Sequence, residues 1–270
     1  MRGSKRIHVL AVVGAWSLVA SASAVLVAAT PETASAGARL ATSATTARTL
    51  GATGNGSASD PFCSPAALGT AQQTLEGALS NRATQLQTLL TRVSNSKDIP
   101  SADASMLDTI VSNEQTGLVD GGIEGLQAMV PKATTCLELL NDAKTMVKDF
   151  WVYALISPQV DLTAVASTEG AIVTQATALE PRIQSAITSA EQRGASVTGA
   201  EAAYGDLQSR ISAASTEVQA VSISTLLSQM PSDFPGDATM LVGYYNDVVG
   251  TGADLRAAGE DVRTIVADLG

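Results

Sequence analysis

The stretch ATMLVGYYNDVVGTGADLRAAGEDVRTIVADL, residues 238–269, decides the fold. Its apolar and small residues recur at alternating steps of four and three, the spacing that keeps one side of an α-helix against a neighbouring helix. This repeat predicts a long amphipathic helix, with Gly252 and Gly259 allowing a close approach of its neighbour. The predicted buried seam consists of Leu241, Tyr245, Val248, Gly252, Leu255, Gly259, Val262, Val266 and Leu269.

Helical spacing of apolar residues extends back along the chain to residue 61. Ser64-Pro65 is a typical helix start, with a capping serine before a first-turn proline. Gly121-Gly122 should interrupt the second helix, because glycine weakens a helix interior. A capping box of Thr198 and Glu201 is expected at the fifth helix. We predict five helices before the last, over residues 64–94, 101–130, 134–156, 162–190 and 198–221.

The fold class is therefore all-α. We expect two three-helix, spectrin-like bundles in tandem, over residues 61–157 and 158–270, that share a central helix kinked at Pro158. If Pro158 instead ends the helix, the chain would form a single compact helical bundle, because proline is poorly tolerated in a helix interior.

The two cysteines test this topology. Cys63 precedes the first predicted helix and Cys136 begins the third, so an antiparallel hairpin with a return places them at the same end of the bundle. In an exported protein such a pair is expected to form a disulfide. A redox-active pair is the alternative, although the CxxC spacing and a neighbouring histidine are missing.

Phe150, Trp151 and Tyr153 belong to a segment, FWVYALI, that is apolar on all sides and ends just before Pro158. Such a helical turn should be buried all round. We expect it at the junction of the bundles, either as core or as the site of a small apolar ligand.

Glu169 falls on the apolar seam of the fourth helix. A charged residue at a seam position often fixes the register of a helical pair. We expect it to pair with Arg182, Arg193 or Arg210.

The N-terminus has the order of a secretory signal, which is basic, then apolar, then small. Arg2, Lys5 and Arg6 precede an uncharged run from residue 7 to 29, and Ala34-Ser35-Ala36 is a suitable cleavage site. We predict a signal peptide over 1–36 and a disordered linker rich in Ala, Thr, Ser and Gly over 37–60. An uncleaved membrane anchor is the alternative, since the apolar run could span a bilayer. After cleavage, no stable membrane insertion is expected.

Charge and composition exclude several functions. Residues 1–36 hold three of the 16 basic and one of the 26 acidic residues, so cleavage changes the net charge from −10 to −12. Such a surface repels the phosphates that nucleic-acid-binding proteins contact. Cleavage also removes His8, the only histidine, and with it imidazole-based catalysis and metal binding. We therefore expect no catalytic residue, metal or cofactor.

The landmarks of the chain resemble a family of actinobacterial secreted, long-helical proteins of uncharacterised function. That family carries Arg and Lys where this chain has Trp151 and Gln159. The resemblance implies export and an all-helical fold, and no activity. It rests on Cys63, Cys136, Phe150-Trp151-Val152-Tyr153 with Pro158, and Asp233-Phe234-Pro235.

These observations favour a secreted or cell-envelope protein that acts as a spacer or binding surface for an unknown protein or envelope component. A carrier of a small apolar ligand near Trp151 is the alternative. An enzyme would have to work with carboxylates, lysines or tyrosines alone.

Overall fold

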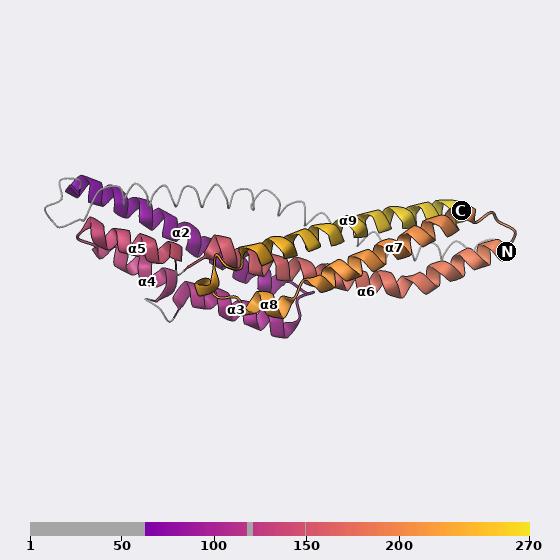
Figure 1. Cartoon of the computed structure of the whole chain (residues 1–270), viewed down its shortest axis with the longest axis horizontal. Coiled ribbons are helices and arrows are strands. Elements are labelled where there is room, and N and C mark those ends of the chain that lie inside the picture. Colours follow the sequence, from indigo (N-terminus) through magenta and orange to yellow (C-terminus); the bar gives the residue numbers. More distant parts are fainter. Residues whose placement is uncertain (1–62, 118–120, 149) are drawn as a thin grey trace. The chain divides into compact units, whose positions relative to one another are not determined.

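A computed structural model describes residues 63–117, 121–148 and 150–270 (Figure 1). The predicted signal peptide, and the linker over 37–60, lie outside these ranges. The described residues form helices and no strand, which confirms the all-α class. None of these helices combines the length and apolar character needed to cross a membrane.

The chain forms two compact units, which we describe separately. The N-terminal unit comprises residues 63–163 and Ile223–Thr239, and the C-terminal unit comprises Ala164–Ser222 and Met240–Gly270. The segment before the last helix thus belongs to the N-terminal unit. The boundary expected from the sequence lay at residue 158.

Helix α2, Pro65–Asn95, is the main helix of the N-terminal unit. The Ser64 hydroxyl accepts a hydrogen bond of 3.2 Å from the Ala67 amide, so the predicted cap is confirmed. Its buried face packs against the three helices that follow it in the chain. That face consists of Leu75, Leu79, Arg82, Leu86, Leu89 and Val93.

Glycine and proline divide the following helices where the sequence predicts. Helix α3, Ser101–Thr116, and helix α4, Gly122–Met129, are separated by Gly121, whose φ of 75° lies in the left-handed region that glycine adopts readily. Pro131 lies in a 3₁₀ turn, η1, Val130–Lys132, after which α5 runs over Cys136–Lys148. The expected break at Gly121-Gly122 is therefore confirmed.

The helix continues through Pro158, so the alternative in which Pro158 ends it is wrong. Helix α5 ends at Lys148, and a π-helical turn, η2, Val152–Ile156, leads directly into α6, Ser157–Gln192. Pro158 is the second residue of α6 and directly follows the π-helical turn, whose carbonyl of Val152 accepts the Ser157 amide. The non-helical residues Phe150 and Trp151 lie upstream of the proline.

The C-terminal unit consists of the later part of α6, α7, Thr198–Ala220, and most of α9, Ala238–Leu269. Arg210 of α7 contacts Asp261 of α9, and Glu217 lies against Gly250, so the two helices are antiparallel. Figure 1 shows the three helices side by side, and their apolar residues share one core. Between α7 and α9 the chain returns to the N-terminal unit through α8, Ile223–Ser228, and the 3₁₀ turn η3, Pro231–Asp233.

Candidate functional site

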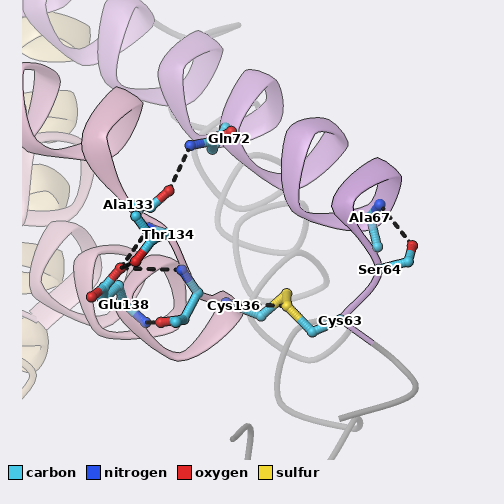
Figure 2. The surroundings of a disulfide bond; sticks show 9 residues. Cys63, Ser64, Ala67, Gln72, Ala133, Thr134, Cys136 and Glu138 are labelled. Carbon is cyan, nitrogen blue, oxygen red and sulfur yellow. Dashed lines mark hydrogen bonds between the residues drawn. A yellow bond between two sulfur atoms is a disulfide. The ribbon is translucent and has the colours of Figure 1, made fainter. Parts of the chain in front are cut away.

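The predicted disulfide is confirmed. Cys63, just before α2, is bonded to Cys136, the first residue of α5, and their Cα atoms are 6.0 Å apart (Figure 2). The Cys136 amide also donates a hydrogen bond of 3.2 Å to the Cys63 sulfur. Two turns into α2, the Gln72 side-chain amide donates a hydrogen bond of 3.0 Å to the carbonyl of Ala133. The disulfide therefore joins two helix starts that polar contacts already hold together.

The start of α5 has a capping box that the sequence analysis missed. The Glu138 carboxylate accepts hydrogen bonds from the amides of Thr134 and Thr135, at 2.6 and 3.1 Å, while the Glu138 amide donates to the Thr135 hydroxyl (Figure 2). These bonds, the Thr134 amide first, lower the pKa of Glu138. The sequence pattern Thr135-x-x-Glu138 would have predicted this capping box.

The capping box expected at α7 is wrong. Thr198 is already the first helical residue, and the capping position is Val197, which has no polar side chain. Val197 is buried in the core of the C-terminal unit. Apolar packing, rather than a cap, therefore fixes the start of this helix.

The aromatic segment lies within the N-terminal unit. Phe150 is buried, whereas Trp151 and Tyr153 are half-buried. The Trp151 ring packs on Phe234, with centroids 4.5 Å apart, and the Arg82 guanidinium lies 5.2 Å from the centre of the Tyr153 ring. The aromatic side chains thus bind together parts of the N-terminal unit that are distant in sequence.

Gln159 has a structural role that the sequence did not reveal. Its side chain is fully buried, and its amide donates to the carbonyls of Leu226 and Gln229, at 2.8 and 3.0 Å. These carbonyls belong to the last turn of α8 and its exit, where a helix has few internal donors for its carbonyl groups, and the Leu226 carbonyl has only a long bond of 3.4 Å from the Gln229 amide besides. Gln159 therefore caps α8 from a distant helix.

Glu169 lies on the buried side of α6, as predicted, and is only 2 % exposed. The predicted partner is wrong. The arginine whose charge acts on Glu169 is Arg256 of α9, and neither carboxylate oxygen has a hydrogen-bond partner. Arg210 instead contacts Asp261, at 2.9 Å, and Asp254, at 4.0 Å.

The surface of α9 carries an apolar row that the predicted seam misplaced. Tyr245 was expected in the core, but Val242, Tyr245 and Val249 are 59, 37 and 39 % exposed. They are three and four residues apart and therefore share one face of the helix. We call these three residues the α9 stripe. The buried face includes Gly252, as predicted, and also Thr251, Ala258 and Ile265, whereas a Cβ atom at Gly259 would meet only open space.

No group of three or more acidic, cysteine or histidine side chains in the described ranges is arranged to hold a metal ion. The carboxylates that do gather are those of the C-terminal unit around Glu169 and Glu217. Comparison of the chain with protein-family models, with curated proteins and with solved structures gives no match.

Proposed function

We propose that this protein is exported and serves, in the cell envelope or outside the cell, as a non-catalytic helical spacer or binding surface. The signal-like order of residues 1–36 and the Cys63–Cys136 disulfide support export, since disulfides persist in oxidising compartments. The resemblance to actinobacterial secreted helical proteins is consistent with this proposal.

The α9 stripe is the observation that carries the binding function. Single exposed apolar residues are ordinary on protein surfaces, but three on one helical face form a continuous apolar row. A tyrosine within such a row is typical of interface hot spots. The stripe therefore provides a surface on which another helix can pack.

The apolar character of the stripe suggests the chemistry of the partner. We expect a partner that presents an amphipathic helix with an apolar row of its own.

Site-specific photocrosslinking on living cells tests this function. A photoreactive phenylalanine analogue at Val242, Tyr245 or Val249 should capture one defined partner. The matched control places the analogue at Glu260 or Arg263, which are exposed on the same helix. Equal capture from stripe and control positions, or no capture from the stripe, would count against a binding surface there.

A tandem arrangement of two three-helix bundles is the finer part of the proposal. It would give the spacer its length, because a helix rises about 1.5 Å per residue. Small-angle scattering of residues 37–270 should then give the pair distribution of a rod. The pair distribution of a compact sphere would exclude the role as a spacer, and the role as a binding surface would still stand.

Transport of a small apolar ligand is the second candidate. It is favoured by Trp151, which is half-buried beside Phe234 in the N-terminal unit. After signal cleavage Trp151 is the only tryptophan of the chain, so its fluorescence reports on this site. Titration with envelope lipids should shift the emission of a carrier, and an unchanged spectrum would contradict this candidate.

A further inference from the structure

Glu169 is the least satisfied buried group in the C-terminal unit. It is 2 % exposed, and both of its carboxylate oxygens are buried without a hydrogen-bond partner. An ionised carboxylate in such surroundings is strongly unfavourable, because water no longer solvates it and no donor replaces the water. A neutral carboxyl group can remain there at a much smaller cost.

Each of the other two helices presents a charged group to Glu169. Helix α7 contributes Glu217 and helix α9 contributes Arg256. The Arg256 Nε donates to the Gly252 carbonyl at 3.0 Å, so part of its hydrogen-bonding capacity is used within α9. The Glu217 carboxylate therefore disfavours ionisation of Glu169, whereas the Arg256 guanidinium favours it.

Glu217 lies tightly against α9. A Cβ atom built on Gly250 would come within 2.6 Å of the Glu217 Oε1 atom, and Oε2 is buried without a partner. Asp247 and Asp254, also on α9, repel the Glu217 carboxylate. An added negative charge on Glu169 would therefore meet an interface that is already rich in carboxylates.

We propose that Glu169 is a proton-controlled latch, whose neutral carboxyl lets α6, α7 and α9 pack around it and whose ionisation loosens that packing. Burial first, and then the charge of Glu217, raise the pKa of Glu169 to about 8, and Arg256 opposes them in part. The latch is independent of the proposed binding function.

The sign of the pH effect follows from proton binding. The packed unit holds a proton on Glu169 that the opened unit releases at the ordinary glutamate pKa of about 4.5. Packing is therefore tightest below that pH and weakens as the pH rises toward 8. The equilibrium constant for opening should increase by up to about tenfold per pH unit over this range. In ordinary acid unfolding the pH dependence is the reverse, because stability falls as the pH is lowered.

Hydrogen exchange of the full chain at pH 5, 6, 7 and 8, corrected for intrinsic exchange rates, tests the latch. Peptides from α7, from α9 and from α6 beyond Ala164 should lose protection as the pH rises. Glu169→Gln and Glu169→Met remove the titrating group and should flatten this response. Glu191→Gln, at an exposed position of α6, is the matched control and should behave as the unsubstituted chain.

Two further measurements make the outcome decisive. Glu217→Gln should shift the midpoint of the response to lower pH, because one of the two causes that raise the pKa of Glu169 is removed. In the unsubstituted chain, the ¹³C chemical shift of the Glu169 carboxyl should titrate above pH 6. The signal is assigned by its absence from the spectrum of Glu169→Met. The latch is excluded if that carboxyl titrates near pH 4.5, or if both substitutions at residue 169 keep the original pH response.

Discussion

At the scale of single residues, buried polar side chains determine most of what the apolar pattern leaves open. Gln159 donates to two carbonyls of a distant segment, although its own amide oxygen is buried without a hydrogen-bond partner, while Glu114 and Glu169 are buried carboxyls with unsatisfied oxygens. A side-chain amide donates hydrogen bonds at any pH, whereas a buried carboxyl can donate one only while it is protonated. The first residue therefore contributes stability at all pH values, and the other two make stability depend on pH.

Replacement of Gln159 by Leu should destabilise the segment that it caps. Both carbonyls lose the Gln159 amide as a donor, and the Leu226 carbonyl keeps only the weaker bond from the Gln229 amide at 3.4 Å. An unsatisfied buried group costs roughly 1–3 kcal/mol. Hydrogen exchange of peptides over residues 223–229 should accelerate strongly. Gln87→Leu, at an exposed position of α2, should leave that exchange unchanged.

Glu114 should make the N-terminal unit less stable at alkaline pH. Burial raises its pKa to about 7, so its stabilising contribution is complete below pH 4.5 and is lost as the pH rises through 7. Glu114→Gln should remove up to about 3 kcal/mol from the stability difference between pH 5 and pH 8. Exchange rates of α3 peptides measure that difference. The exposed neighbour Asp108, changed to Asn, should preserve it.

At the scale of elements, helix ends and helix contacts decide which predictions hold. Ser64, Gly121 and the cysteines lie at helix ends, where local chemistry is specific, and the structure confirms them. Periodicity alone placed Tyr245 in the core, and proline alone suggested a helix end at Pro158, and both predictions were wrong. A seam drawn every seven residues shares Leu241, Val248, Leu255 and Val262 with the structure. Between them, Gly252 is buried as predicted, and Val266 and Leu269 pack against the core. Tyr245 is exposed and a Cβ atom at Gly259 would meet no neighbour, because which flank is covered depends on α6 and α7.

The disulfide should stabilise the N-terminal unit substantially. It closes a loop with a sequence separation of 73 residues, which corresponds to about 4 kcal/mol in the chain-entropy model. Reductant should therefore lower the melting temperature of the unsubstituted chain by several degrees. The double variant Cys63→Ser, Cys136→Ser should melt at the lower temperature, whether or not reductant is present.

Two glycines of α9 should respond differently to alanine. At Gly243 a Cβ atom meets nothing within 4 Å, so Gly243→Ala should gain about 1 kcal/mol from helix propensity. At Gly250 it would displace the Glu217 carboxylate, so Gly250→Ala should gain less or destabilise the unit. Urea unfolding of both variants measures the difference. Equal gains would mean that Glu217 moves away at no cost.

At the scale of the whole molecule, the described part of each unit contains a buried glutamate whose pKa is raised. Glu114 belongs to the N-terminal unit and Glu169 to the C-terminal unit. The melting temperature of the chain should therefore fall between pH 5 and pH 8. The double variant Glu114→Gln, Glu169→Gln should show a nearly flat profile in calorimetry. An unchanged decline would show that other groups control it.

The sequence was sufficient for the all-α fold, the helix ends marked by Ser64, Gly121 and Pro131, and the cysteine pair. It was insufficient for the polar contacts, since Gln159 with Leu226 and Arg256 with Glu169 join positions 67 or more residues apart. A single helix shows which residues are apolar, but not which of its flanks a neighbour covers. For the same reason the α9 stripe could be recognised only in the structure.

The Cys63–Cys136 bond also has a mechanical consequence. When the chain is pulled from its ends, the 73-residue loop closed by the bond cannot extend, so about 250 Å of contour length stays out of the path of the force. In single-molecule stretching, unfolding of the N-terminal unit should lengthen the oxidised chain by that much less than the reduced one. A spacer built in this way would limit its own extension under load.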